Sequence, residues 1–540
     1  MGMPPVFRPA VLAASCLALI SGSGLAAQEA PIELPKYTVT TERDLPPPEE
    51  WFYARVEGFE VLSNATAPDT RRLLNDFQRF GYSLNLIWPG LRLTGAASAS
   101  LIICGRKEKF EEFLPDSLRK SERASTSFHL RARDQGAIVL DYQTKVLNLA
   151  GVEDEPGAAP TAPDSADEPS GSTHPQGFAV DSYQQLYREY LRFLLSARAV
   201  PQPAWLTEGL SQLFMKLHIT ETEISVGRVE DPNLAPDRGA GGPAEDRDFN
   251  AALARRALLP MAELFAVAND SVTTQNPLNR IWAKQSYAFV HWGLYGDLGR
   301  NKKAFGTFVA RLEREPLSET LFKDCFKSGY ADMQQTLRNH LESTRAQFEG
   351  VRADKGQKIP FPAEPVVRSA TEAEVGRLKG DALNLAGHPA EARSALIIAY
   401  RRGERDPNLL AALGLAELAA GETDRARKFL EAAATGKAVR PRAHVELARL
   451  RLAEAQARPE AAGKLSAAQG ARVLEPLRLA RSQPPALPET YELIGATWSA
   501  CATAPPAAHL ELLKEGLRLF PNDAALRARF ESLATTAAHP

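Results

Sequence analysis

Charged side chains recur at a chemically suggestive spacing between residues 181 and 217. Arg188, Glu189 and Arg192 lie on a segment whose apolar residues recur at helical intervals, so the two arginines share one helix face. Glu208 follows on a second apolar segment, after a proline-containing turn. Two side chains one helical turn apart, an acidic neighbour and a carboxylate from a following helix form the geometry of a catalytic zinc site. That chemistry needs histidine at positions 188 and 192, and this chain has arginine at both.

The same stretch resembles the two catalytic helices of gluzincin metallopeptidases, most closely the peptidase MA-like domains of bacterial envelope proteins. In that family an HExxH helix is followed by a proline-rich turn and a W-L-x-E-G segment that supplies a third zinc ligand. Here the second motif is intact as Trp205-Leu206-Thr207-Glu208-Gly209, whereas the first reads Arg188-Glu189-Tyr190-Leu191-Arg192. The resemblance covers roughly residues 51–345 and implies a gluzincin-like fold without its zinc-binding histidines.

Arginine at the two ligand positions removes the chemistry of the site. A guanidinium stays protonated and has no lone pair to offer, and two cations repel Zn²⁺. Without a metal there is no Lewis acid and no activated water for Glu189 to act on. We therefore expect no bound metal, no other cofactor and no catalytic residue. Arg188, Glu189, Arg192 and Glu208 are interpreted as a vestigial site in which opposite charges cancel and arginine forks bond Glu208 in the place of zinc.

Other interpretations stay open at this point. The first segment could be an ordinary amphipathic helix whose charged residues face solvent. The chain could be an active peptidase that holds zinc through non-standard ligands, for which His218 and His291 are the nearest histidines. Glu189 and Glu208 could also work as a carboxylate pair without metal. Finally, the front domain could be a scaffold with no peptidase ancestry.

The N-terminus has the pattern of a cleaved secretory signal. Arg8 supplies a positive charge, an apolar core follows over residues 9–20, and small residues precede a cleavage point after Ala26 or Ala27. No later apolar run approaches the length of a membrane span. The net charge of −2 and the absence of a basic cluster argue against nucleic-acid binding. We expect a periplasmic or extracellular protein with no integral membrane segment after cleavage.

The remaining cysteines do not form a framework. Cys104, Cys325 and Cys501 are widely spaced and odd in number, with no CxxC pair, so they encode neither a set of disulfides nor a cysteine zinc site. Cys104 lies in an apolar, strand-like run and is interpreted as a small buried hydrophobic residue.

The composition changes several times along the chain, and the changes divide it into segments. The expected segments are a signal peptide (1–27), an extended and poorly ordered lead-in (28–50), a small α+β lobe (51–150), a disordered insertion (151–178), a helical metallopeptidase-like lobe (179–349), a linker (350–371) and helical repeats (372–540). Within the front domain we expect strands at 59–63 and 100–104, an antiparallel pair at 127–130 and 137–141, and helices at 69–80, 281–295, 303–314 and 333–343.

The last third of the chain contains a repeat. Five small or apolar positions, Gly380, Gly387, Ala392, Leu396 and Ala399, recur 34 residues later as Gly414, Gly421, Ala426, Leu430 and Ala433. This period is similar to that of tetratricopeptide (TPR) repeats. The register slips near residues 458–470 and resumes at Tyr491, and a capping helix is expected at 523–533. Such an array binds proteins or peptides and folds through contacts between neighbouring repeats. A generic array of helical hairpins is the alternative.

Together these patterns predict an α+β gluzincin-like N-terminal domain joined to an all-α TPR-like solenoid. The function that fits them is that of a secreted envelope pseudoenzyme, with a zinc-less pseudopeptidase domain and a solenoid for protein–protein interaction. The alternative function is an active zinc-type or carboxylate-dependent peptidase with non-standard ligands.

Overall fold

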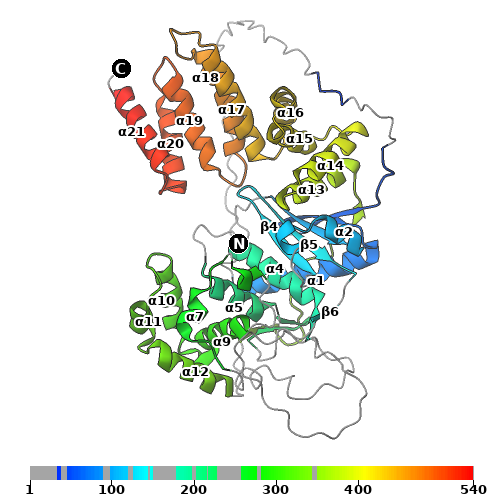
Figure 1. The fold of residues 1–540 in the computed structure, drawn as a ribbon, viewed down its shortest axis with the longest axis vertical. Helices are drawn as coiled ribbons and strands as arrows, with labels where there is room; N and C mark the ends of the chain where they lie inside the picture. Colours follow the sequence, from blue (N-terminus) through cyan, green and yellow to red (C-terminus); the bar gives the residue numbers. More distant parts are fainter. Residues whose placement is uncertain are drawn as a thin grey trace, which may run out of the picture.

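The computed structural model describes the chain in thirteen stretches. They are residues 33–37, 45–56, 58–88, 98–119, 126–143, 146–149, 178–196, 202–215, 217–227, 257–269, 271–275, 281–342 and 349–538. The expected signal peptide and all but the last residue of the expected disordered insertion lie outside these stretches. The described chain forms a mixed sheet with its covering helices, a helical lobe below it and a C-terminal stack of helices above it (Figure 1).

The sheet has the strand order β11-β1-β2-β3-β5-β4. Its strands are β1 (Phe52–Val56), β2 (Phe59–Ser63), β3 (Ser98–Cys104), β4 (Ser127–Arg131), β5 (Gln135–Asp141) and β11 (Arg368–Ser369). The central strands β2, β3 and β5 run parallel, and the outer pairings are antiparallel. The strands expected at 59–63 and 100–104 and the expected antiparallel pair are therefore confirmed, and the sequence gave no signal for β11.

Both faces of the sheet are buried, and alternate residues serve opposite faces. Val61, Leu101 and Ile138 belong to the core shared with α1 (Ala67–Ile87) and α4 (Ser182–Ser196). Leu62, Ile102 and Val139 point the other way, toward α2 (Lys107–Glu112) and α13 (Glu372–Leu385). Cys104 is fully buried on this second face, as its sequence context indicated. The sheet is thus the middle layer of three, and α13 supplies part of the third layer.

The helical lobe packs around an aromatic core. Its helices are α5 (Ala204–Phe214), α7 (Met261–Ala266), α8 (Val272–Gln275), α9 (Ile281–Tyr295), the 3-10 helix η3 (Gly296–Gly299), α10 (Lys302–Leu312), α11 (Glu319–Phe326) and α12 (Tyr330–Glu342). Trp205 of α5 is fully buried against Phe289 and Phe308. Gly209 lets α5 and α9 approach closely, because a Cβ there would lie 2.6 Å from the backbone oxygen of Ser286. The glycine of the W-L-x-E-G segment therefore has a packing reason.

Short elements complete the front domain. They are α3 (Asp116–Arg119), the paired strands β6 (Val146–Leu149) and β7 (Phe178–Asp181), and the three-stranded sheet of β8 (His218–Ile219), β9 (Glu223–Val226) and β10 (Glu349–Arg352). No helix in the described stretches has the length and apolar character needed to cross a membrane.

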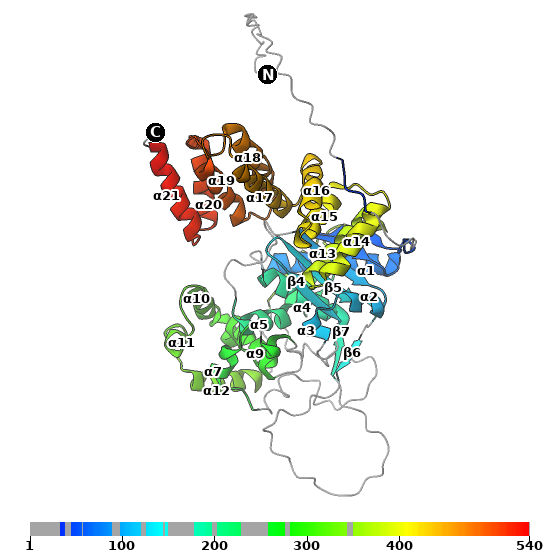
Figure 2. The same cartoon turned by 45° about the horizontal axis from the view of Figure 1, so that its top comes forward.

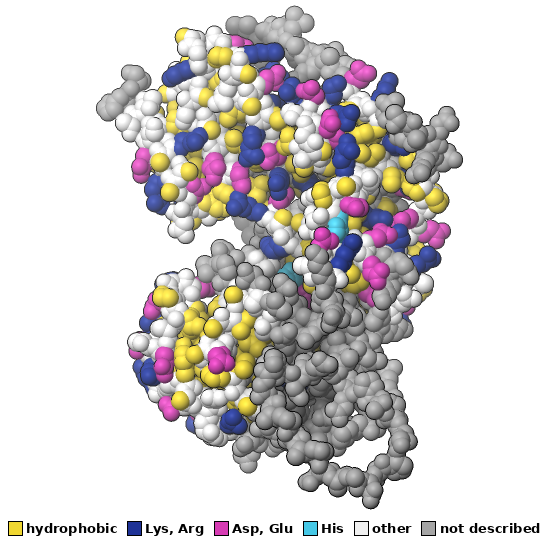
Figure 3. Space-filling model, viewed as in Figure 1, with side chains coloured by type: hydrophobic (Ala, Val, Ile, Leu, Met, Phe, Trp, Pro, Cys, Tyr) yellow, Lys and Arg dark blue, Asp and Glu magenta, His cyan; other side chains and the backbone are white. Residues whose placement is uncertain are grey.

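The C-terminal helical stack, residues 372–538, consists of helical hairpins and a final helix (Figures 1 and 2). Its helices are α13, α14 (Pro389–Arg401), α15 (Pro407–Ala419), α16 (Thr423–Thr435), α17 (Pro441–Ala457), α18 (Ala467–Arg481), α19 (Pro488–Ala500), α20 (Ala507–Leu519) and α21 (Ala524–Ala538). On the face shown in Figure 3, basic and acidic side chains are interspersed over the stack. An α+β front region followed by a helical stack agrees with the expected fold class at that level.

The repeat has a structural basis within the first two hairpins. Gly387 and Gly421 adopt positive φ angles of 89° and 81° in the turns, which favour glycine. Gly380 and Gly414 lie where the helices of a hairpin touch, since a Cβ on either would meet Leu396 or Leu430 at 2.7 Å. The period therefore records where two helices cross and where they are joined.

Two segments pack more closely than their composition indicated. The lead-in was expected to be poorly ordered, yet Glu49 forms ion pairs with Lys109 at 2.8 Å and Lys379 at 3.0 Å. The 350–371 linker adds strands to two sheets at its ends, and Arg79 lies over the ring of its Phe361 at 5.0 Å. Proline-rich composition measured the lack of regular structure in these segments but not their side-chain contacts.

Candidate functional site

The arginine-carboxylate cluster lies between α4 and α5. Apolar residues of α4, among them Leu186 and Tyr190, bury that helix against the core below the sheet, and α5 is buried along its length. This packing turns Arg188 toward Glu208. The guanidinium donates through Nε to Oε1 at 3.1 Å and through Nη2 to Oε2 at 2.7 Å. Arg188 is 3% exposed and Glu208 is 2% exposed, so the bidentate pair is buried.

Glu189 is the second carboxylate of the cluster. Its Oε1 accepts from Arg188 Nη1 at 2.7 Å and from Arg192 Nη1 at 3.4 Å. Its Oε2 accepts from Nδ1 of His129 at 2.6 Å, because an ionised carboxylate can only accept. Arg192 also donates to the backbone oxygen of Thr274 at 3.3 Å. The expectation of arginine forks on Glu208 is therefore confirmed for Arg188, whereas the recorded bonds of Arg192 go elsewhere.

Charge pairing controls the protonation of the cluster. Burial on its own would raise the pKa of Glu189, but the charge of Arg192, the hydrogen bond from His129 and the charge of Arg188 hold it well below its usual range. Burial would lower the pKa of Arg188, and the charges of Glu208 and Glu189 outweigh that effect and raise it. Glu189 is consequently ionised at neutral pH and has no proton to donate as an acid.

The exposed-helix interpretation of residues 188–192 is wrong, since Arg188 and Glu189 are 3% and 4% exposed. Of the two histidines considered as substitute ligands, His218 is exposed on β8. His291 is buried and donates through Nε2 to the Gly227 carbonyl at 2.8 Å, while its Nδ1 lies 2.9 Å from Nε2 of His340. Burial lowers the pKa of His291. His291 is a hydrogen-bonded packing residue.

Two members of the cluster were missed by sequence reasoning. Gln212 donates through Nε2 to Glu208 Oε1 at 2.7 Å, and its position four residues after Glu208 on one helix could have indicated the contact. His129 comes from β4, 60 residues before Glu189. Nothing local marks it, because its approach depends on how α4 crosses the sheet.

The residues of the cluster do not fit the zinc ion that the family resemblance implies. Both oxygens of Glu208 and one oxygen of Glu189 accept bonds from Arg188, which occupies the space between the two carboxylates with a cation. Within the described stretches no group of three or more His, Cys, Asp or Glu side chains is arranged to hold a metal ion.

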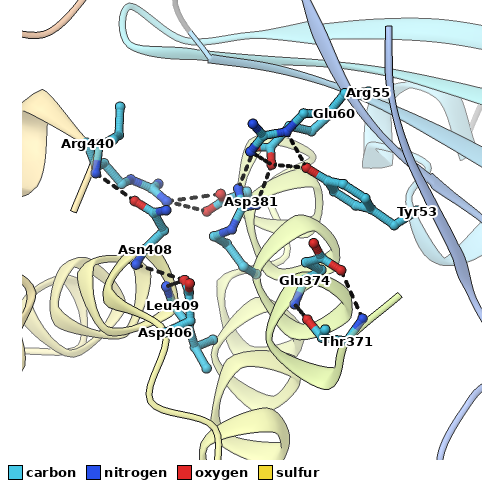
Figure 4. A network of polar contacts seen from close by, with 12 residues as sticks. Tyr53, Arg55, Glu60, Thr371, Glu374, Asp381, Asp406, Asn408, Leu409 and Arg440 are labelled. Atoms are coloured by element: carbon cyan, nitrogen blue, oxygen red, sulfur yellow. Dashed lines mark hydrogen bonds and ion pairs between the residues drawn. The ribbon is translucent and has the colours of Figure 1, made fainter. Parts of the chain in front are cut away.

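A second polar cluster lies at the junction of the sheet and the helical stack (Figure 4). It surrounds a cavity of about 300 Å³. Arg377 of α13 bonds both oxygens of Glu60 at 2.8 and 2.9 Å, and Arg440 bonds both oxygens of Asp381 at 2.8 and 3.0 Å. The hydroxyl of Tyr53 donates to Glu60 at 2.8 Å. These carboxylates are already paired with arginines, and the contacts join the stack to the sheet.

Comparison with protein-family models, with curated proteins and with solved structures found no match to this chain. Its function is therefore inferred from the geometry of its own residues.

Proposed function

We propose that the chain is a secreted bacterial envelope protein with two working parts. The front domain is a gluzincin-like pseudopeptidase without zinc, and the helical stack is a TPR-type solenoid that binds a partner protein. The observation that carries the first part is the buried fork of Arg188 on Glu208, at 3.1 and 2.7 Å. It joins the position of the first HExxH histidine to the position of the third zinc ligand in the family that the motifs resemble.

The recruiting role of the stack is supported by its repeat and by the lack of a catalytic arrangement in it. The period of 34 residues, with glycine at the turns and at the helix crossings, is the pattern of a TPR array. Such arrays contribute an extended binding surface and no chemistry of their own.

An active carboxylate-dependent hydrolase is less well supported. That reaction needs one carboxylic acid with a raised pKa to protonate the leaving group. In this chain the arginines and His129 hold the pKa of Glu189 far below that range. Neither acid–base roles nor a metal are available to the cluster without breaking the Arg188 pairs.

The proposal is tested by restoring the histidines. The double variant Arg188→His, Arg192→His should bind zinc with a stoichiometry near one, because it recreates two imidazoles one turn apart facing Glu208. The unchanged chain should bind no stoichiometric zinc and should not cleave casein. Zinc content is measured by plasma emission after dialysis. Far-UV circular dichroism with and without zinc shows whether the double variant folds.

The matched control adds Glu208→Ala to the double variant and should lose the zinc. Stoichiometric zinc in the unchanged chain, lost on Glu208→Ala, would overturn the pseudopeptidase proposal. A folded double variant that ignores zinc would remove the gluzincin-like geometry, and with it the argument from the motifs.

A further inference from the structure

A short stretch of the lead-in, Glu33–Tyr37, lies on the helical stack beside α14 and α16 (Figure 2). The ring of Tyr37 stacks on Phe429, with centroids 6.2 Å apart and planes at 14°. It meets Tyr400 edge-on at 5.8 Å and 82°. The hydroxyl of Tyr400 in turn donates to the backbone oxygen of Pro35 at 2.9 Å. One aromatic side chain and one backbone carbonyl of the segment are therefore read by the same pair of helices.

The tyrosine hydroxyl has a dedicated acceptor. It donates to Oε1 of Glu417 at 2.9 Å, and Glu417 is 0% exposed. Arg393 holds the same carboxylate through bonds of 2.7 and 3.1 Å, and Arg425 lies 5.8 Å over the Tyr37 ring. Burial, the bond with Glu417 and its charge all raise the pKa of Tyr37, so the phenol remains a donor at neutral pH. A buried carboxylate, two cations and two aromatic rings thus surround one side chain.

The residues that contact the segment depart from the repeat. At the positions 34 residues before Glu417 and Phe429 the chain has Leu383 and Ala395. The hairpin architecture therefore accommodates an apolar residue in the place of Glu417 and a small one in the place of Phe429. A buried carboxylate is costly unless it is bonded. Its presence at this one hairpin is explained by recognition of a tyrosine hydroxyl.

The segment itself has the properties of a peptide ligand. Leu34, Pro35 and Tyr37 are partly buried, whereas Glu33 and Lys36 are exposed. Proline limits the free chain to extended conformations, which lowers the entropy lost on binding. Affinity comes from Leu34 and Tyr37 and from the carbonyl between them.

We propose that this surface of α14 and α16 binds an extended segment of a partner protein that carries leucine, proline and tyrosine at the spacing of Leu34, Pro35 and Tyr37. Glu33–Tyr37 occupies the surface as a tethered competitor. This inference rests on the proposed function, because it names the chemistry that the solenoid reads. Only seven residues, 38–44, join Tyr37 to the described stretch 45–56. A tether of that length gives a local concentration on the order of millimolar, which a partner must exceed.

The test offers the chain its own segment in trans. A fluorescein-labelled peptide with the sequence of residues 31–40 is titrated with the full chain, with the Tyr37→Ala chain and with the matched Lys36→Ala chain, and anisotropy is measured. Tyr37→Ala should bind the peptide at least about tenfold more tightly than the other two, because the tethered competitor is lost. A peptide with alanine in place of the tyrosine should bind none of the three.

A second variant locates the contact. Glu417→Leu introduces the residue found one repeat earlier, and in the Tyr37→Ala chain it should weaken peptide binding about tenfold or more. Thermal melting by circular dichroism confirms that each variant is folded. Equal binding by the unchanged and Tyr37→Ala chains, absence of binding by all of them, or unaltered binding after Glu417→Leu would each overturn the inference. Zinc binding by the histidine variants is read in a different part of the molecule, so such a failure leaves the proposed function standing.

Discussion

The two polar clusters of the molecule use the same residue types and differ in burial. In each an arginine fork bonds both oxygens of a glutamate. The side chains of Arg188 and Glu208 are both 3% exposed, whereas those of Arg377 and Glu60 are 11% and 19% exposed. Geometry alone would give the two pairs equal weight. Burial predicts otherwise, because breaking a fully desolvated pair leaves a charge that water cannot reach.

The clusters also differ in what they connect. Arg188 and Glu208 are 20 residues apart and belong to neighbouring helices, whereas Arg377 and Glu60 are 317 residues apart and join the helical stack to the sheet. The first pair occupies the centre of the resembled zinc site, and the second closes a boundary between two parts of the fold. An ion pair that replaces a metal has to be dry, while one at a boundary can remain in contact with solvent.

The largest effect is expected for Glu208→Ala. The substitution leaves Arg188 buried with one of its two carboxylate partners, and the free energy of unfolding should fall by about 3–5 kcal/mol. Urea unfolding followed by tryptophan fluorescence measures the loss. A cost under about 1 kcal/mol would show that the cluster behaves like an exposed pair, and the contrast between the two clusters would disappear.

The matched control removes both charges together. The double variant Arg188→Met, Glu208→Leu should recover a large part of the stability lost by Glu208→Ala, because neither partner is left unpaired and the volume is filled. Stability as low as that of the single variant would mean that Glu189 and Gln212 depend on the pair for their positions.

A smaller effect with a defined pH dependence is expected for Glu189→Gln. The folded pKa of Glu189 lies below its usual value of 4.5, so its contribution is fully present above about pH 4.5 and is lost as the pH falls through the folded value. The loss of unfolding free energy at pH 7 should be about 1.5–3 kcal/mol and should shrink below about pH 4.5.

Urea unfolding from neutral to acidic pH tests this dependence. Glu315→Gln is the control, since Glu315 pairs with Arg311 on the surface and its loss should leave stability unchanged within error. A cost for Glu189→Gln that is the same at every pH would mean that packing, and not charge, accounts for it.

Local patterns predicted most of the elements, because helical and strand periodicity depend on neighbours in the chain. They also predicted the pairing of Arg188 with Glu208, since both positions belong to motifs of fixed spacing. The division between the small lobe and the repeats was less visible. Leu378 and Leu383 of α13 pack on the sheet, and nothing in the repeat pattern distinguishes that apolar face from one that contacts another hairpin.

What could not be predicted are contacts between distant segments. His129 reaches Glu189 from a strand, and Tyr37 reaches Glu417 over 380 residues. Each depends on the path of the whole chain. The one signal available for the second contact was a carboxylate at an otherwise apolar position of the repeat, which becomes informative only when Glu417 is compared with Leu383.

The smallest effect, and the one that most directly separates the clusters, is expected for Arg377→Met. The pair with Glu60 is partly exposed, and Arg55 and Tyr53 still contact Glu60 after the change, so the free energy of unfolding should fall by about 1–2 kcal/mol. Raising NaCl from about 0.1 M to about 1 M shortens the screening length from about 10 Å to about 3 Å, and the cost should decrease because solvent ions reach this junction. The cost of Glu208→Ala should stay constant over the same range, since ions do not enter a buried site. Urea unfolding of both variants at both salt concentrations gives the comparison, with Lys36→Ala as a surface control. If Arg377→Met costs as much as Glu208→Ala and is equally insensitive to salt, the junction is as dry as the centre of the front domain. Burial would then no longer distinguish the two clusters.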